Sequence, residues 1–266
     1  MIDRATFDAN LVADARAAGA DCRLEAMVRA VDDAGHIFLA SGERLHPRLI
    51  IGADGPRSLI GRAIGARNTE LVETRQVSVR LCGTYAATDI FLSAAIPGGY
   101  GWMFPKRDTA NVGVGVAAHR KGKLKPLVED LHERLVREGR VGRTILGITG
   151  GAIPVGGIIR SVGALHQTAV LLAGDAAGLA NPITGAGINA AVLSGALAGE
   201  AALSWLSGHS TALDDYGAEL EELLGPGLKR ALRHRQRMNA YLESGDGPSP
   251  ADLRHAWVAY EAYWKS

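Results

Sequence analysis

The pattern of apolar residues changes twice along this chain, and this change limits the possible folds more than any other feature. Two runs, RLIIGADG (48–55) and TAVLLAGD (168–175), are almost continuously apolar and end at glycine-bounded turns. Such runs are typical of strands that are buried on both faces of a parallel sheet. From about Thr69 to Val155, apolar and polar residues instead alternate with period two, as in TRQVSVRLCGTY and TANVGVGVAA. The sequence therefore predicts one α/β layer built from both ends of the chain, with an antiparallel sheet inserted between them.

Helices are predicted on both sides of this insert and once within it. Their signals are apolar residues at helical spacing, with Gly or Pro where a segment stops. The predicted helices cover 4–18, 124–137, a long alanine-rich segment from Gly187, a segment from Leu213 that breaks at Gly225-Pro226-Gly227, and 251–264 after a linker at 245–250. Two more strands are predicted at 22–31 and 36–40. The predicted domains are 1–67 (first part of the layer), 68–155 (antiparallel sheet), 156–212 (second part of the layer) and 213–266 (helical C-terminal region).

The composition is that of a globular protein and argues against several functions. The 266 residues are 47% hydrophobic and carry a net charge of +1, which gives no electrostatic basis for binding nucleic acid. Cys22 and Cys82 lie far apart in the sequence, so we expect a reducing, cytoplasmic location and no disulfide framework. The first residues lack an apolar core, so no signal peptide is predicted. The uncharged stretch 176–199 contains Asn, Pro and many Gly, which predicts a buried helix rather than a membrane span.

The loop before the alanine-rich helix carries candidate binding residues. The stretch 185–190 fits the dinucleotide-binding pattern G-x-G-x-x-A, but it begins ten positions after Asp175, whereas a Rossmann turn follows its strand directly. The stretch 113–118 also fits, yet its valines alternate as in a strand. Asp175 ends a buried strand, where a carboxylate can bind ribityl hydroxyls, and the helix start can stabilise the N1–C2=O edge of a flavin. The alternative is an ordinary strand–loop–helix connection.

Three motifs, in a consistent order, resemble one group of flavoproteins. Residues 52–58, GADGPRS, resemble the GADGxxS motif of the para-hydroxybenzoate hydroxylase-like group. Residues 173–178, followed by Pro182-x-x-Gly185-x-Gly187, resemble the second FAD motif of that group. Between them, YGWMFPKRDTANVGVG (100–115) is similar to the signature YxWxFPKxxxxxVGxG of the geranylgeranyl reductase family. The resemblance runs from Asp3 to about Ala202 and includes the helix at 4–18.

The resemblance implies an FAD site that is built from both ends of the chain. Asp54 and Gly55 would lie near the FAD pyrophosphate, and Asp175 would hold the ribityl chain. The residues implied to face the isoalloxazine ring are Gly185, Ala186, Gly187, Ile188 and Asn189, and Pro182 of the same motif is a further implied cofactor-binding residue. Gly61 stands before Arg62 where family members often carry another arginine, so the loop after Asp54 departs from the family pattern. A simple turn is the alternative for Asp54-Gly55, because Asp-Gly is common in turns.

The residues Tyr100, Trp102 and Phe104 alternate and therefore share one face of a strand. Core packing is one interpretation, and the wall of an apolar substrate tunnel beside the flavin is the one that the family implies. The expected function is an FAD-dependent oxidoreductase that reduces isoprenoid carbon–carbon double bonds, with NAD(P)H or ferredoxin as electron donor. No catalytic residue and no metal ligand is assigned, and Tyr100 is a proton-donor candidate by its chemistry alone. The alternatives are a flavin monooxygenase or halogenase of the same fold, or a non-catalytic, truncated or split subunit that binds a prenyl lipid.

The family opens with a βαβ unit that bears G-x-G-x-x-G, and this sequence begins after that unit. The expected fold class is α/β: an incomplete FAD-binding Rossmann-like layer domain, an inserted antiparallel β-sheet substrate domain and a helical C-terminal tail. The chain alone is expected to bind FAD weakly or not at all, unless a partner chain or dimer mate supplies the phosphate-binding unit. Basic runs at 120–125 and 229–237 are expected to face solvent or to contact anionic lipid at the inner face of the membrane.

Overall fold

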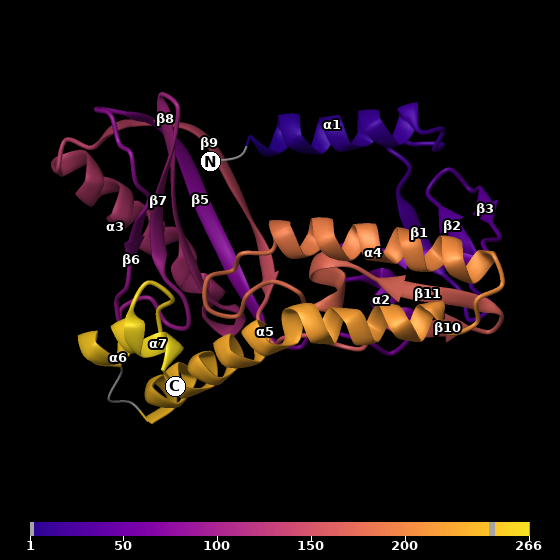
Figure 1. Cartoon of the computed structure of the whole chain (residues 1–266). Coiled ribbons are helices and arrows are strands. Elements are labelled where there is room, and N and C mark those ends of the chain that lie inside the picture. The colour runs from indigo at the N-terminus through magenta and orange to yellow at the C-terminus, as the bar shows by residue number, and fades with distance from the viewer. Residues whose placement is uncertain (1–2, 245–247, 266) are drawn as a thin grey trace.

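Three β-sheets form the framework of the computed structural model, which describes residues 3–244 and 248–265 (Figure 1). A small antiparallel sheet contains β1 (Val28–Val31), β2 (Ile37–Leu39) and β3 (Arg44–Leu45). A second sheet has the order β10 (Val162–Leu165), β11 (Thr168–Leu172), β4 (Leu49–Gly52). The third has the order β6 (Asp89–Phe91), β7 (Gly101–Lys106), β8 (Thr109–Ala117), β5 (Leu71–Leu81), β9 (Val141–Pro154).

The two apolar runs that the sequence analysis singled out are adjacent parallel strands. β11 pairs in parallel with β4, with Leu172 opposite Gly52, although 120 positions separate these residues. Because β11 is fully buried, its side chains form a core with three helices: α2 (Leu59–Ala63), α4 (Ile188–Leu206) and α5 (Ala212–Ser244). The Tyr216 hydroxyl of α5 donates to the Leu172 carbonyl at 2.6 Å and ties α5 to this sheet. The layer is thus assembled from both ends of the chain.

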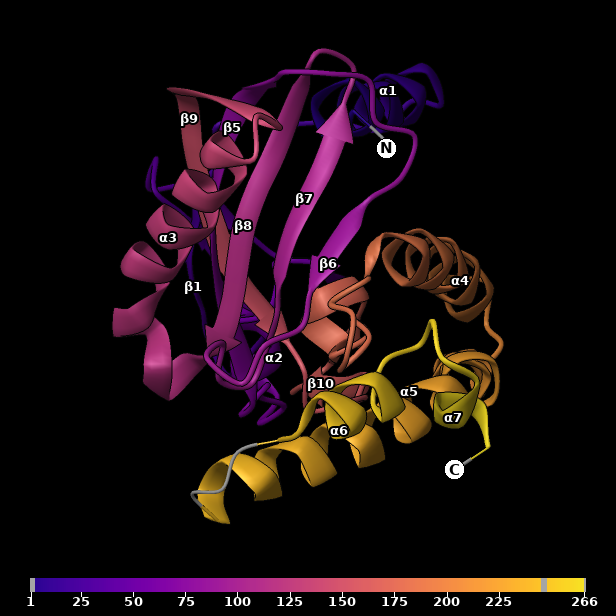
Figure 2. The same cartoon turned by 90° about the vertical axis from the view of Figure 1, so that its left-hand side faces the viewer.

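The inserted sheet is antiparallel throughout and has its own core. The helix α3 (Leu124–Arg137), which follows the short helix η1 (Ala118–Lys123), covers one face of the sheet. There Met103, Val112 and Val114 pack against Leu135, and all four side chains are completely buried. Figure 2 shows α3 on one side of this sheet and the loop that leads into α4 on the other. The α/β class with an antiparallel insert is confirmed, and the domain boundaries at 67/68, 155/156 and 212/213 stay predictions.

A set of apolar side chains remains exposed on α1 (Arg4–Ala17), β4 and α4. The helix α1 forms where it was predicted, but it has no buried residue, and the described residues place no strand on the outer edge of β4. α4 was predicted to be buried, and this was wrong: it packs on one side only, because no described element covers the other. We call these exposed residues the open region: Leu11 (47% exposed), Ile51 (38%), Val192 (47%), Leu203 (70%) and Leu206 (44%).

Three local predictions differ from the structure. α5 continues through Gly225-Pro226-Gly227, where a break was predicted, because Leu220 and Leu228 on either side are both buried in the same core. The last predicted helix is two short ones, α6 (Pro250–His255) and α7 (Glu261–Trp264), which a turn separates. Residues 22–27, predicted as part of a strand, precede β1 as a loop. The predicted linker includes residues 245–247, which lie outside the described residues. In the part of the chain that the structure describes, no helix is both long and apolar enough to cross a membrane.

Candidate functional site

The candidate site begins at the carboxyl ends of the two parallel strands. Because β4 and β11 are parallel neighbours, the loops that contain Asp54 and Asp175 leave the same edge of the sheet. The side chain of Asn68 joins the two loops, since its Nδ2 donates to the Pro56 carbonyl at 3.1 Å and to the Asp175 carbonyl at 2.9 Å. The structure thus brings the two predicted acidic residues to one edge, as parallel pairing requires.

The carboxylate of Asp54 accepts hydrogen bonds from residues at the start of α2. It accepts hydrogen bonds from the Ser58 hydroxyl and from the backbone N–H groups of Leu59 (2.7 Å) and Ile60 (3.2 Å). Gly55 has a φ of +83°, a left-handed conformation that favours glycine. The local structure therefore explains Asp54-Gly55 as a turn with a helix cap, and the position of these residues beside an FAD pyrophosphate stays a prediction.

Asp175 differs, because no described residue donates a hydrogen bond to its carboxylate. It lies in the short helix η2 (Gly174–Ala177), facing the start of α4: a Cβ on Gly187 would lie 3.1 Å from Asp175 Oδ1. No side chain caps α4 at Gly187, so the partial positive charge of the helix start is open to a ligand. Burial raises the pKa of Asp175, and Arg4 of α1 opposes this rise. Asp175 and the uncapped helix start together offer acceptors and donors that the protein leaves unused.

The loop between η2 and α4 has a fixed conformation. The Asn181 side chain accepts from the backbone N–H groups of Ile183 and Thr184, both at 3.0 Å, and its backbone carbonyl accepts from Gly185 N at 2.8 Å. Gly185 has a φ of +67°, and a Cβ there would lie 3.1 Å from Ile153 of β9. The backbone conformation therefore favours glycine at Gly185, and a side chain there would also press on Ile153 of β9.

The aromatic residues of β7 lie on the face opposite to the α3 core. The side chains alternate, so Met103 enters the core while Trp102 and its neighbours Tyr100 and Phe104 face the loop before α4. Trp102 stacks on Phe104 (centroids 5.8 Å apart) and meets Tyr100 edge-on (5.7 Å). It lies across Gly113, its partner in β8, where any Cβ would collide with the indole ring. The glycine at 113, which fitted a dinucleotide pattern in the sequence, therefore makes room for Trp102.

A cavity of about 660 Å³ brings the aromatic face and the glycine loop together. Its predicted members are Tyr100, Trp102, Phe104, Gly185 and Ala186, and the Tyr100 hydroxyl donates to the Thr184 carbonyl across it. Burial raises the pKa of Tyr100 to about 12, so this hydroxyl is neutral at ordinary pH. The volume lies within the range of small-molecule sites in proteins. The other predicted residues, Pro182, Gly187, Ile188 and Asn189, belong to the same loop and to the start of α4 but do not line the cavity.

The observed donors and acceptors fit one end of FAD. An unused carboxylate suits ribityl hydroxyls, and an uncapped helix start suits the N1–C2=O edge of the isoalloxazine ring. Because Gly187 has no side chain, the Asp175 carboxylate can lie close to the start of the helix. At the other end, Asp54 already has three hydrogen-bond donors within the protein, so the fit rests on the Asp175 end.

Three residues of the site were not predicted from the sequence. Gln76 of β5 lines the large cavity and accepts a hydrogen bond from Trp102 Nε1 at 3.2 Å; its position in a period-two strand placed it on the same face. Trp257 contacts Tyr100 edge-on with centroids 4.9 Å apart, and no local pattern signals this long-range contact. Arg235 of α5 is buried beside the loop before α4, although its sequence context is that of a basic surface helix.

Comparisons with known proteins identify relatives that match most of this chain. A family model described as the geranylgeranyl reductase catalytic domain matches residues 76–153. The digeranylgeranylglycerophospholipid reductase of Methanosarcina acetivorans is 33% identical over 241 residues, which cover 84% of this chain and 56% of that protein. The enzyme of the same name from Methanocella arvoryzae is 31% identical over 260 residues, or 89% of this chain and 63% of that protein. The chain thus spans less than two thirds of the length of these relatives.

Solved structures show the same fold. A geranylgeranyl bacteriochlorophyll reductase-like protein from Thermoplasma acidophilum superposes with a TM-score of 0.76 at 22% identity, covering 96% of this chain and 71% of that one. The flavin-dependent halogenase CmlS superposes with a TM-score of 0.60 at 18% identity, covering 98% of this chain and 50% of that one. At these identities, the likeness establishes the fold of flavin-dependent enzymes.

Proposed function

Because the chain belongs to the geranylgeranyl reductase family of FAD-dependent oxidoreductases, we propose that it reduces carbon–carbon double bonds of an isoprenoid chain. The observation that carries this proposal is the cavity of about 660 Å³ that the aromatic face of β7 shares with the glycine loop before α4. Bound FAD supplies the hydride in such a reduction. The protein must then bind the chain, orient one double bond and keep water away.

The residues proposed to hold FAD lie along the edge of the layer. Asp175 accepts hydrogen bonds from ribityl hydroxyls, while Asp54 and Gly55 lie towards the pyrophosphate. The residues proposed around the isoalloxazine ring are Pro182, Gly185, Ala186, Gly187, Ile188 and Asn189. The unused Asp175 carboxylate and the uncapped start of α4 support this placement.

The residues proposed to hold the substrate are Tyr100, Trp102 and Phe104. These side chains lie on the face of β7 that is outside the α3 core. This position favours a role in the wall of the substrate site rather than in core packing. The Tyr100 proton is directed at the Thr184 carbonyl, and burial raises the pKa of this hydroxyl to about 12. We therefore assign Tyr100 to positioning the loop, and we nominate no proton donor.

This chain covers less than two thirds of the length of its relatives. The cofactor, the electron donor and any partner chain are therefore stated here as proposals. FAD binds this chain weakly, and a partner chain or dimer mate that supplies a phosphate-binding unit strengthens it. NAD(P)H or ferredoxin is the electron donor. Basic residues on α5, such as Arg233 and Arg237, are exposed and are placed to contact anionic lipid at a membrane surface.

The experiment supplies the chain with excess FAD, dithionite and a digeranylgeranylglycerophospholipid, and follows saturation of the double bonds by mass spectrometry. Trp102→Ala is expected to reduce turnover of long isoprenoid chains more than that of short ones, because each buried CH₂ contributes about 0.8 kcal/mol. Met103→Ala, on the core face of the same strand, is the matched control. It is expected to lower the melting temperature without changing the preference for chain length.

Two results would contradict this function. Hydroxylated or halogenated aromatic products, without isoprenoid reduction, would place the protein with the monooxygenases or halogenases. Binding of the prenyl lipid without any reduction at saturating FAD would make it a non-catalytic subunit.

A further inference from the structure

The last part of the chain carries an aromatic residue that contacts the candidate site. In the sequence HAWVAYEAYW (255–264), Trp257 lies in the turn between α6 and α7. Two backbone hydrogen bonds of 3.0 Å hold this turn: Trp257 N donates to the Arg254 carbonyl, and Tyr260 N donates to the Trp257 carbonyl. The backbone of Trp257 is therefore fixed by the turn itself.

The two helices on either side of this turn are fixed as well. Tyr263 of α7 is 2% exposed, and its ring stacks on that of His234 of α5 with centroids 4.4 Å apart. His234 Nε2 also donates to the Tyr263 carbonyl at 3.1 Å. At the start of α6, Ser249 and Asp252 form a reciprocal pair of helix-capping hydrogen bonds. The indole ring of Trp257 thus has a defined position beside Tyr100.

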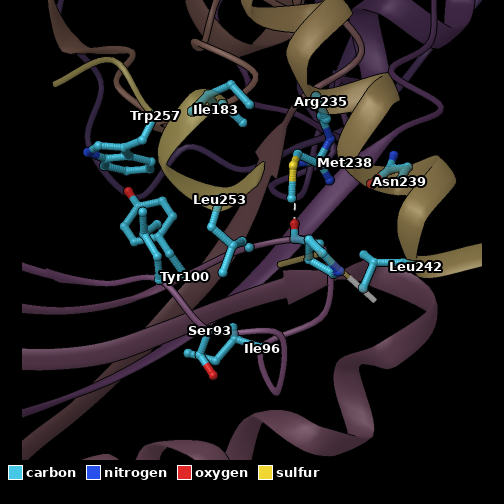
Figure 3. Close-up of a pocket in the computed structure, with 15 residues that line it drawn as sticks. Ser93, Ile96, Tyr100, Ile183, Arg235, Met238, Asn239, Leu242, Leu253 and Trp257 are labelled. Carbon is cyan, nitrogen blue, oxygen red and sulfur yellow. Dashed lines mark hydrogen bonds between the residues drawn. The ribbon is translucent and has the colours of Figure 1, made fainter. Parts of the chain in front are cut away.

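Trp257 separates two cavities. Together with Tyr100 it lines both the large cavity and a second cavity of about 60 Å³ (Figure 3). The two rings meet edge-on with centroids 4.9 Å apart, and the Tyr100 hydroxyl is bonded to the Thr184 carbonyl. Figure 3 shows these rings on one side of the second cavity and Met238 and Leu242 on the other. The aromatic pair is therefore a partition between the two spaces.

The second cavity is suited to hydrocarbon. Apolar side chains form most of its wall, and its polar members are few. The apolar ones include Ile96, Ile183, Met238, Leu242 and Leu253, and the polar ones are Ser93, Arg235 and Asn239. Burial of CH₂ groups in such surroundings is favourable, so an isoprenoid chain that reached this space would gain affinity.

The large cavity has a solvent side and an inner end. The face of β7 that lines it extends from Tyr100 to Phe104. Because β6 and β7 are antiparallel with Asp89 opposite Met103, Thr88 lies beside Phe104, and Thr88 is exposed. Trp257 lies at the other end, on Tyr100. An isoprenoid along β7 therefore keeps its polar end near solvent and places its apolar end at Trp257.

We propose that Trp257 limits the length of the isoprenoid chain that this protein accepts. Its indole ring closes the inner end of the large cavity and keeps the chain out of the second one. The inference rests on the proposed function, and it adds to the proposed site a residue that determines specificity.

The experiment measures the binding of prenyl alcohols with two to five isoprene units, from geraniol to geranylfarnesol, by isothermal titration calorimetry at one detergent concentration. With the wild type, we expect the affinity to rise with each unit and then to stop rising at one length. In Trp257→Ala the affinity should continue to rise past that length, by about 10-fold or more for the next unit. Trp257→Phe should give a smaller gain, and it replaces Trp257→Ala if that variant does not fold.

Two further variants are matched to this change. Trp205→Ala removes a half-buried tryptophan of α4 that lines neither cavity, and it should keep the wild-type length limit. Leu253→Phe, added to Trp257→Ala, fills the second cavity and should restore the limit. Partition of the alcohols into detergent is the same for every variant and cancels between them.

Several outcomes would overturn the inference. An affinity that rises across the whole series in the wild type would do so, as would an unchanged limit in both Trp257 variants. A lower melting temperature in Trp257→Ala with the same limit would give Trp257 a purely structural role. A limit that stays shifted after Leu253→Phe would exclude the second cavity as the space that the longer chain enters. In each case, isoprenoid reduction that still depends on Trp102 leaves the proposed function intact, whereas a length limit without any reduction contradicts that function alone.

Discussion

The hydroxyl of Tyr100 connects the two halves of the candidate site. It extends from the residue before β7 to the Thr184 carbonyl in the loop before α4, so this hydrogen bond helps to join the inserted sheet to the layer domain. Burial raises the pKa of Tyr100 to about 12. A group whose pKa is higher in the folded state than in the unfolded state loses its contribution to stability as the pH rises between the two values.

Tyr100→Phe tests this connection. Below about pH 10, the variant should be less stable than the wild type by about 0.5–1.5 kcal/mol, because it lacks the hydrogen bond. Above about pH 10, the unfolded wild type ionises before the folded form does, so the wild type loses stability and the variant does not. Thermal melts of both proteins across this range should converge at alkaline pH. Tyr216 also has a raised pKa, but it is present in both proteins, so its effect on stability cancels in the comparison. Melting temperatures that differ by the same amount at every pH would contradict the role assigned to Tyr100.

Asp175 and Gly187 are expected to control FAD affinity. Asp175→Ala removes the unused carboxylate and should weaken FAD binding about 10-fold or more. Gly187→Val should be more harmful, since its Cβ alone would lie 3.1 Å from Asp175 Oδ1 and 3.4 Å from the Ala180 Cβ. Fluorescence titration with FAD measures both, and Asp33→Ala, at an exposed position, is the control. Unchanged affinity in both variants would remove this loop from the cofactor site.

Among the helices, α5 is the one whose sequence and structure disagree most. Its interior contains Gly225, Pro226 and Gly227, which lower helix stability, yet the helix is continuous over 33 residues. Burial of Tyr216, Leu220 and Leu228 against the parallel sheet compensates for these residues. α5 is therefore held by tertiary packing rather than by its own helical propensity.

This interpretation predicts that Gly227→Ala stabilises the protein. Gly227 is exposed, its φ is not positive and a Cβ there would meet no atom within 4 Å. The substitution should add about 0.5–1 kcal/mol and raise the melting temperature by about 1–4 °C. Gly178→Ala is the contrasting case, because Gly178 has a φ of +75° and a Cβ would collide with the Gly157 carbonyl. A destabilised Gly227→Ala would mean that α5 needs its flexibility there.

Most strands could be predicted because their patterns are local, whereas β3, β9 and β10 were not predicted individually. Period-two alternation gave β5, β7 and β8, and two apolar runs gave β4 and β11. The roles of Gly185 and Gly187 in the loop before α4 came from the resemblance to the flavoprotein motif, and they stay predictions. The course of α5 and the exposure of α4 depend on what packs against each helix, and no window of sequence contains that information. Arg235 and Trp257 were missed because distant parts of the chain bring them to the site.

For the molecule as a whole, we expect the open region to limit cofactor binding. The outer edge of β4 pairs with no described strand, and apolar side chains of α1 and α4 remain exposed. An unpaired strand edge is a common site of association. The purified 266-residue chain is therefore expected to show no flavin absorption in its visible spectrum and to self-associate at high concentration. A yellow, monomeric preparation with one FAD per chain would contradict this expectation.

The exposure of α1 has one more consequence. None of its 14 residues is fully buried, and isolated helices of this length are marginal in water. Its amide hydrogens should therefore exchange with solvent almost as fast as those of a free peptide, while those of β11 are protected by the core. Any molecule that covers the open region would slow exchange in α1 first. The exchange rate of the α1 amides, measured by hydrogen–deuterium exchange, therefore shows whether the open region is covered, and no activity measurement is needed.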